Sequence, residues 1–320
     1  MCGLAALFSY GANAPTINRN QLDAIHDRQA ARGPDSEGVW ISDDNHVAMA
    51  HRRLSIIDLS EAGAQPMASK DNAYRVVFNG EIYNYRALRQ ELIDDGVELN
   101  SNSDTEVLLQ LYIKRGPAMV DALRGMFAFA IWDAKRQGMF MARDAYGIKP
   151  LYFADDGKTL RVASQVKALV AGGGIDTSPA PAGHVGFFLL GYVPEPYTLY
   201  KGIKAVPAGG SLWVDTSGRS APHKWFNLTR ELSEIDPAPY NAEALREALV
   251  DSIQHHLVAD VPVGVFLSAG LDSASLVALA SEVHGANLRT VTLGFQQFRG
   301  SENDEAPLAE GLAKHYETDH

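Results

Sequence analysis

The chain has little cysteine, no long apolar run and fewer basic than acidic residues. Its 320 residues include one cysteine, Cys2, which excludes an internal disulfide framework. The longest apolar candidate, 185–193, is shorter than the ~18 residues of a membrane span, and the N-terminus lacks the basic region of a signal peptide. A net charge of −11 and an isoelectric point near 5.3 argue against nucleic-acid or anionic-membrane partners. We therefore expect small-molecule substrates and, by default, the cytoplasm.

The single cysteine stands where removal of Met1 would make it N-terminal. An N-terminal cysteine carries a thiol nucleophile and an α-amine on one residue. A free α-amine titrates near pH ~8, close enough to neutrality to act as a general base without a separate histidine. Taken alone, a lone cysteine is more often a small, inert hydrophobe. The downstream motifs decide between these two interpretations.

The first part of the chain predicts a β-rich layer covered by helices. Short apolar runs between turn residues indicate strands at 4–10, 39–41, 47–50, 54–59, 74–78, 127–132, 139–142, 151–153 and 160–163. Helical spacing appears at Leu88, Leu92 and Ile93, and again after Asp104, which we expect to cap its helix. Glycine and proline predict a flexible break at 172–174 and 179–183.

The second part of the chain follows a different period. The polar, proline-bearing stretch 219–240 marks the boundary. An amphipathic helix of about four turns follows, with apolar residues at Leu245, Leu249, Ile253 and Leu257. Next come a strand, a helix ended by Gly285, a strand and a helix, at 261–267, 274–284, 288–295 and 304–316. This alternation indicates a parallel α/β sheet, in which a loop before a helix N-terminus can bind phosphate.

Short motifs run through the chain in a fixed order. In the first part they are MCG at 1–3, RGPD at 32–35, HRRLSIID at 51–58, GAQP at 63–66, NGEIYN at 79–84, SDTE at 103–106, GMFAFA at 125–130 and RD at 143–144. In the second they are DVPVG at 260–264, SAGLDS at 268–273 and LG at 293–294. Each motif alone is weak. In this order they resemble the glutamine-hydrolysing asparagine synthetases, including the ATP-pyrophosphatase region of that family.

That resemblance implies two domains, of α+β and α/β class. The first is a class II glutamine amidotransferase (glutaminase) domain over 1–225, an α-β-β-α sandwich of the Ntn-hydrolase type. A linker over 226–240 leads to 241–320, the N-terminal part of a parallel-sheet ATP-pyrophosphatase domain of the adenine nucleotide alpha hydrolase-like fold. The family's later acidic motif and acceptor pocket do not appear before His320. We therefore expect a truncated second domain, and glutaminase activity alone.

The resemblance implies glutamine hydrolysis in the first domain. Cys2 would attack the glutamine carboxamide, release ammonia and form a thioester that water hydrolyses. After removal of Met1, the α-amine of Cys2 would relay the protons. The Asn79 side chain and the Gly80 N–H would stabilise the oxyanion.

The resemblance also implies groups that hold the amino-acid end of glutamine. Arg53 would grip the α-carboxylate, since a guanidinium fork can bind both oxygens. Glu81 and Asp104 would face the α-ammonium. Taken singly, these residues have ordinary explanations: Arg53 as a surface ion-pair residue, Asp104 as a helix cap and 79–80 as a hairpin turn. Their joint occurrence behind an N-terminal Cys-Gly favours the glutamine site.

For the second domain the resemblance implies ATP and Mg²⁺ as cofactors. The nucleotide-binding residues would be Leu267, Ser268, Gly270, Leu271, Asp272, Ser273 and Leu293. Asp272 would also reach Mg²⁺, which is commonly held by one or two carboxylates plus phosphates. Two departures stand out. Ala269 replaces a usual glycine, which would cost ~1 kcal/mol if the position needs a positive φ, and Ala30 and Ala31 replace usual basic or histidine residues.

The family's overall reaction passes ammonia to an ATP-activated aspartate and gives asparagine, AMP, pyrophosphate and glutamate. A second possibility is the same chemistry on a different carboxylate, in secondary-metabolite or polysaccharide biosynthesis. A third is a scaffold that kept the fold without catalysis, against which the retained residues Cys2, Arg53, Asn79 and Asp104 argue. The substrates would thus be glutamine and aspartate, and a homodimer stays open.

Overall fold

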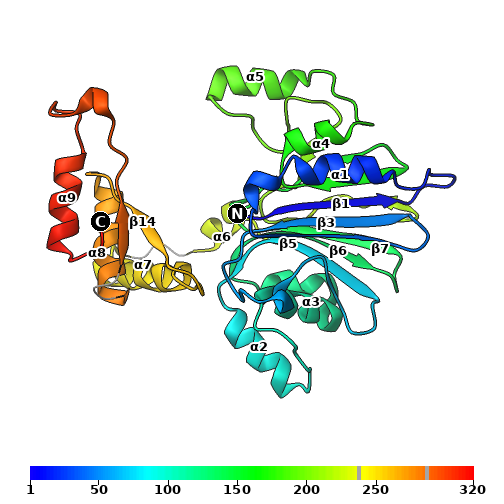
Figure 1. Ribbon diagram of the computed structural model, residues 1–320, viewed down its shortest axis with the longest axis horizontal. Helices are drawn as coiled ribbons and strands as arrows, with labels where there is room; N and C mark the ends of the chain where they lie inside the picture. Colours follow the sequence, from blue (N-terminus) through cyan, green and yellow to red (C-terminus); the bar gives the residue numbers. More distant parts are fainter. Residues whose placement is uncertain (236–238, 285–287) are drawn as a thin grey trace. The chain divides into compact units, whose positions relative to one another are not determined.

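The computed structural model in Figure 1 describes residues 1–235, 239–284 and 288–320, with His284 described by its backbone alone. Its residues form two compact units, Met1–Ile235 and Asp236–His320, so the division falls inside the predicted linker. Positions 236–238 of that linker, and the predicted helix stop Gly285, lie outside the described residues. No described helix is long and apolar enough to cross a membrane.

Two antiparallel sheets form the centre of the first unit. One has the order β10-β8-β9-β1-β3-β2, built from β1 (Gly3–Ser9), β2 (Ser36–Ile41), β3 (Val47–Arg53), β8 (Tyr152–Asp155), β9 (Thr159–Ala163) and β10 (Lys204–Ala205). The other has the order β12-β11-β7-β6-β5-β4, with β13 also paired to β11. It contains β4 (Met67–Ala68), β5 (Tyr74–Ile82), β6 (Gly125–Asp133), β7 (Gly138–Arg143), β11 (Gly210–Asp215), β12 (Gly218–Arg219) and β13 (His223–Lys224).

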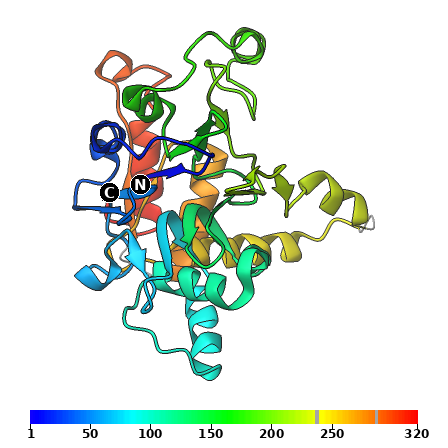
Figure 2. The same ribbon diagram turned by 90° about the vertical axis from the view of Figure 1, so that its right-hand side faces the viewer.

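Helices cover the outer face of each sheet. Helices α1 (Arg19–Asp27) and α4 (Val166–Gly172) lie on one side, and α2 (Tyr85–Asp94) and α3 (Asp104–Arg115) on the other (Figure 1). Figure 2 shows α1 in blue and α2 in cyan on opposite sides of the strands again. Outside these layers lie α5 (Pro181–Leu190), α6 (Leu228–Glu234) and the 3₁₀ turns Ala30–Arg32, Glu61–Gly63 and Gly116–Ala122. The unit is therefore the expected four-layer α-β-β-α sandwich.

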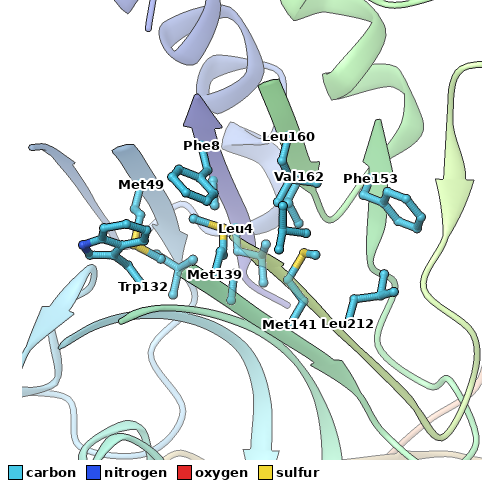
Figure 3. Packing of buried hydrophobic residues seen from close by; sticks show 14 of the residues in the cluster. Leu4, Phe8, Met49, Trp132, Met139, Met141, Phe153, Leu160, Val162 and Leu212 are labelled. Carbon is cyan, nitrogen blue, oxygen red and sulfur yellow. The ribbon is translucent and has the colours of Figure 1, made fainter. Parts of the chain in front are cut away.

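Strand β1 is buried on both faces, as its apolar sequence predicts. Leu4, Ala6 and Phe8 pack into the cluster between the two sheets, while Ala5 and Leu7 pack against α1 and α4. Figure 3 shows the inter-sheet cluster, with labelled side chains at Leu4, Phe8, Met49, Trp132, Met139, Met141, Phe153, Leu160, Val162 and Leu212. This central, doubly buried strand fixes the place of the residues just before it.

Three local predictions are wrong, and each has its own physical reason. Residues 54–59 form a loop rather than a strand. The helix after 103 is capped by the Ser103 hydroxyl, which accepts the Thr105 N–H at 3.1 Å, while the carboxylate of Asp104 turns inward. Part of the predicted break at 179–183 begins helix α5, because Pro181 suits the first turn of a helix.

The second unit has the predicted parallel α/β order. It contains α7 (Ala242–His256), β14 (Gly264–Phe266), α8 (Leu271–His284), β15 (Arg289–Val291), the 3₁₀ turn Gln296–Phe298 and α9 (Ala306–His315). Strands β14 and β15 pair in parallel, and both are shorter than predicted. The core joins Ile253, Leu267, Val277 and Leu288. Because β14 and β15 run parallel, both strands end at the same edge of the sheet, next to the start of α8.

Candidate active site

Cys2 lies immediately before β1, on the face that points between the two sheets. Its Sγ contacts the backbone of Leu54, as a donor to the carbonyl at 3.6 Å and as an acceptor from the N–H at 3.4 Å. The Arg32 guanidinium binds the Cys2 carbonyl, with Nε donating at 2.7 Å. The Asp35 carboxylate accepts the Ser55 N–H at 2.8 Å. The motif at 32–35 thus anchors both the cysteine and the loop beside it.

A pocket with an empty volume of about 430 Å³, including its open mouth, contains this thiol. Its lining brings together the predicted glutamine-site residues with several others: Met1, Cys2, Arg53, Leu54, Ile56, Ile57, Gln65, Phe78, Asn79, Gly80, Glu81, Ser103, Asp104, Thr105 and Lys149. The predicted glutamine-site residues therefore share one pocket with the Cys2 thiol.

One edge of β5 faces this pocket without a neighbouring strand. Strand β4 pairs with β5 only as far as Val76, whereas β6 pairs along the other edge to Ile82. Gly80 stands opposite Phe127, which exchanges both of its backbone hydrogen bonds with Asp144: the Phe127 carbonyl accepts at 2.8 Å and its N–H donates to the carboxylate at 3.1 Å. Since paired residues in an antiparallel ladder either bond each other or both point away, Gly80 directs its N–H away from β6.

The Asn79 side chain is completely buried, and neither its Oδ1 nor its Nδ2 has a hydrogen-bond partner among the described residues. A buried amide without partners costs about 1–3 kcal/mol for each unsatisfied group. Such a cost persists where a ligand completes the hydrogen bonds. Asn79 is therefore suited to bind a polar atom in the pocket.

Gly80 lies inside β5, so 79–80 is not the hairpin turn considered above. A Cβ at Gly80 would lie 2.2 Å from the Met126 carbonyl oxygen. The glycine is thus required by close packing against β6, and not by an unusual φ. Its place next to Asn79 puts an amide side chain and a backbone N–H at the same part of the pocket.

Arg53, at the end of β3, is buried and held by the loop that follows it. Its guanidinium donates to the carbonyls of Ser60 at 2.9 Å, Ile57 at 3.4 Å and Asp58. These bonds explain why 54–59 is no strand, since its carbonyls face a side chain. A Cβ at Gly63 would lie 2.3 Å from the guanidinium, so this glycine leaves the space for it. The result is a fixed positive group in the pocket wall.

Asp104 and Glu81 are buried carboxyl side chains of the same pocket. One Asp104 oxygen accepts the Ile82 N–H at 3.0 Å. Burial raises the pKa of Asp104 to about 7; the Ile82 hydrogen bond opposes this shift and the Glu81 charge adds to it. Two acidic groups near a small cavity favour a bound cation, which would stabilise the ionised form of Asp104.

The cysteine and the terminal amine are both perturbed by the pocket. Burial raises the pKa of the Cys2 thiol, and the hydrogen bond from Leu54 and the charge of Lys149 oppose that shift. Burial lowers the pKa of the amine, which in this chain belongs to Met1. Both shifts favour the neutral form of the group concerned, which is the form that each partner of an acid and base pair has before proton transfer.

Sequence reasoning missed Lys149, a buried cation of the pocket whose pKa is lowered by burial. Asp144 fixes its backbone, because the carboxylate accepts the N–H groups of Ile148 at 2.8 Å and Lys149 at 2.9 Å. The RD motif at 143–144 was the available signal, although it does not reveal which residue the turn presents. Ala30 and Ala31 are exposed on a 3₁₀ turn outside the pocket lining.

The predicted nucleotide residues meet at the carboxyl edge of β14 and β15. The Leu267 N–H donates to the Val291 carbonyl at 2.9 Å, which places Leu267 beside the end of β15, two residues before Leu293. Ser268 and Ser273 bond through their hydroxyls at 2.9 Å, across the start of α8. Ligands of open α/β sheets bind at this edge, with phosphate at the helix N-terminus. The arrangement fits a nucleotide phosphate.

Two further observations concern this loop. Ala269 is not among the described residues with positive φ, so its Cβ brings none of the strain considered above. In the described ranges no group of three or more His, Cys, Asp or Glu side chains is placed to hold a metal ion. A Mg²⁺ ion here would therefore depend on the nucleotide phosphates and at most one or two carboxylates, which is the usual manner of its binding.

Comparison with known proteins shows that two families match this sequence. The glutamine amidotransferase domain family matches residues 1–226, and the asparagine synthase family matches 244–320. A solved structure of a glutamine phosphoribosylpyrophosphate amidotransferase from B. subtilis covers 97% of this chain, and 70% of that chain is matched, with a TM-score of 0.50 and 19% identity. At this identity the likeness shows the fold alone.

Curated relatives share more of the sequence. Asparagine synthetase [glutamine-hydrolyzing] 1 of Bacillus subtilis is 38% identical over 96% of this chain and 48% of its own length. Asparagine synthetase B [glutamine-hydrolyzing] of Escherichia coli is 36% identical over 88% of this chain and 45% of its own length. Amidase chry2 of Gibberella zeae is 34% identical over 88% of this chain and 43% of its own length. The chain spans about half the length of these relatives.

Proposed function

Since the chain belongs to the glutamine amidotransferase family and continues into an asparagine synthase region, we propose that its first unit hydrolyses glutamine to glutamate and ammonia at Cys2. The observation that carries the proposal is the completely buried Asn79 amide, which has no partner among the described residues and lines the same pocket as the thiol. A folded protein tolerates such an unsatisfied group most readily where a substrate satisfies it.

The proposed reaction begins after Met1 is removed, when the α-amine belongs to Cys2. The amine takes the thiol proton, and the sulfur attacks the carboxamide carbon. Asn79 Nδ2 and the Gly80 N–H donate to the oxyanion that forms. The protonated amine then gives its proton to the leaving ammonia, and the thioester remains. Water, activated by the same amine, hydrolyses the thioester to glutamate and returns the thiol.

The amino-acid end of glutamine is proposed to lie between Arg53 and the two acidic residues. The guanidinium is fixed by three carbonyls, so it can bind the α-carboxylate without reorganising. Asp104 and Glu81 would receive the α-ammonium. The bound ammonium would lower the pKa of Asp104 and so favour its ionised form.

For the whole protein we propose the asparagine synthetase reaction, in which the aspartate carboxylate would react with ATP to give an acyl-adenylate and pyrophosphate, and ammonia would then displace AMP to give asparagine. The residues that would hold ATP are Leu267, Ser268, Gly270, Leu271, Asp272, Ser273 and Leu293, with Asp272 near Mg²⁺. ATP would supply an adenylate leaving group for the carboxylate. The loop at 268–270 would bind phosphate through its backbone and hydroxyl groups.

The same chemistry on another carboxylate is the second candidate. The similarity to a relative named an amidase supports it, because the family includes proteins with other names. A non-catalytic scaffold is disfavoured by the intact pocket. A reducing compartment, such as the cytoplasm, would suit a free catalytic thiol. A homodimer stays a prediction.

The test is glutamate release by the purified chain, combined with labelling by a chloroketone analogue of glutamine. We expect activity, loss of Met1 in the intact mass, and one label on Cys2. Cys2→Ala should abolish both activity and labelling while the fold persists, because little volume changes. Retained Met1 together with an unlabelled Cys2 would refute the proposal.

A further inference from the structure

The Phe78 peptide groups, just before the proposed oxyanion donors, are held by two side chains instead of a strand. The Phe78 N–H donates to Gln65 Oε1 at 2.6 Å, and its carbonyl accepts from His51 Nε2 at 2.8 Å. Strand β4 ends its pairing with β5 at Val76. The two bonds therefore replace the missing ladder on both sides of one residue.

His51 crosses the sandwich to make its bond. It lies on β3, two residues before Arg53 and opposite Leu4 of β1, while Phe78 belongs to the other sheet. The ring is completely buried, and burial lowers the pKa of His51 to about 4, so it is neutral at physiological pH. Because a carbonyl only accepts, Nε2 carries the proton. Nδ1 has no partner among the described residues.

Gln65 makes the complementary link. Its Oε1 accepts from Phe78, and its Nε2 donates to Thr105 Oγ1 at 3.2 Å. Thr105 follows Asp104 at the start of α3. Gln65 thus connects β5 to the helix that carries the proposed ammonium-binding carboxylate, whereas His51 connects β5 to the strand that carries Arg53.

We infer that His51 and Gln65 are positioning residues, which fix the two peptide planes flanking Phe78 and thereby orient the donors of Asn79 and Gly80. This inference rests on the proposed glutaminase function. The Phe78 carbonyl and the Asn79 N–H belong to one planar unit, so a rotation of that unit moves the Asn79 side chain. A misplacement of 1 Å in an active site can cost ~10²-fold in rate.

The first test compares steady-state kinetics of His51→Met and His51→Gln with the unchanged chain. Methionine keeps the volume and removes the donor, whereas the glutamine amide can place an N–H near the former Nε2. We expect His51→Met to lower kcat by ~10-fold or more with KM changed less than threefold, and His51→Gln to recover most of the loss. Gln65→Met should resemble His51→Met. Labelling of Cys2 counts the folded active sites.

His46→Met is the matched control. His46 also bonds a backbone carbonyl, that of Ser9 at 3.2 Å, but at the other end of β1. We expect its kinetics to match the unchanged chain. If His46→Met and His51→Met lower kcat equally, or if His51→Met lowers the labelled fraction without changing kcat per labelled site, the role is structural and the inference is wrong.

A double-mutant cycle separates positioning from general stability. Since His51 would act through Asn79, we expect His51→Met to cost markedly less, below ~3-fold in kcat, when Asn79 is already alanine. An equal cost in both backgrounds would overturn the inference. Loss of Asn79 leaves the Gly80 donor, so a small remaining effect is expected.

We call the bonds of His51 and Gln65 to the Phe78 peptide groups the clamp. Hydrogen exchange tests this clamp without relying on catalysis. In His51→Met the amides of a peptide covering 74–82 should exchange at least several-fold faster than in the unchanged chain, while those of β7, at 138–143, stay the same. An unchanged rate at 74–82 would refute the clamp. If the unchanged chain lacks glutaminase activity but His51→Met loosens 74–82, the proposed function fails and the clamp stands as a structural device without an oxyanion role.

Discussion

Glutamine binding should release a proton near neutral pH, because Asp104 changes its ionisation. In the free protein the pKa of Asp104 is about 7. The α-ammonium of glutamine binds the ionised form, so binding lowers this pKa and becomes stronger as pH rises through 7. With a pKa of 7, the ionised fraction of Asp104 is about 0.5 at pH 7 and about 0.09 at pH 6. The apparent Kd for glutamine should therefore be about fivefold higher at pH 6 than at pH 7.

Calorimetry on the Cys2→Ala variant measures this binding without turnover. Titrations in two buffers of different ionisation enthalpy give the protons released, which we expect to be about 0.5 per glutamine at pH 7. Asp104→Asn is the matched variant, since its amide oxygen can still accept the Ile82 N–H. In that variant the pH dependence should disappear, and glutamine should bind ~10–100-fold more weakly at pH 8, the scale of one hydrogen bond to a charged group.

The raised pKa of Asp104 also makes the stability of the fold depend on pH. Glutamine binding becomes stronger as pH rises, whereas the folded state becomes less stable. A carboxyl whose pKa is raised from 3.8 to about 7 by burial destabilises the folded state at every pH above 7, by up to about 4 kcal/mol. The penalty appears between pH ~4 and ~7 and is absent below. Asp104→Asn should therefore raise the melting temperature at pH 8 and leave it nearly unchanged at pH 4. A glutamine Kd that varies less than twofold from pH 6 to 8, without proton release, would refute the reasoning.

Three further predictions concern the separate roles. Asn79→Ala should lower kcat ~10²-fold with little change in KM, because one oxyanion donor is lost in the transition state. Arg53→Ala should raise KM steeply and change kcat less; equal effects of both variants on both parameters would contradict the assignment. With ATP, Mg²⁺ and aspartate, the 320-residue chain should release glutamate but form no asparagine, because Leu271 and Leu293 at the nucleotide loop are 87% and 68% exposed, so that the described residues do not hold the reactants in a fixed geometry. Aspartate-dependent pyrophosphate release at an ordinary enzymatic rate would disprove this.

Apolar runs in the sequence predicted the strands whose side chains form the core. Strand β1 is apolar throughout and buried on both faces, and β6 and β7 are likewise buried runs. Residues 54–59 also contain an apolar run, yet the carbonyls of Ile57 and Asp58 accept hydrogen bonds from the Arg53 guanidinium and the stretch forms no ladder. A sequence pattern records side chains, and it does not show which backbone groups a distant side chain will occupy.

The candidate glutamine site was predictable through its motifs, and the structure brings Cys2, Arg53, Asn79, Gly80, Glu81 and Asp104 to one pocket. Their roles stay predictions until tested. Lys149 was not predictable, because Asp144 presents it through a turn of backbone hydrogen bonds. The bond between His51 and Phe78 joins positions 27 apart in the chain and could not be read from either motif.

The unpaired edge of β5 has a consequence for what the pocket can recognise. An open strand edge ordinarily accepts another extended chain. Here the Phe78 N–H is occupied by Gln65 and the Ile82 N–H by Asp104, so of the N–H groups at 78, 80 and 82 only that of Gly80 lacks a partner among the described residues. One donor can hold one carbonyl, but it cannot hold a strand. The pocket should therefore discriminate between free glutamine and glutamine within a polypeptide, and leave glutaminyl side chains of proteins intact.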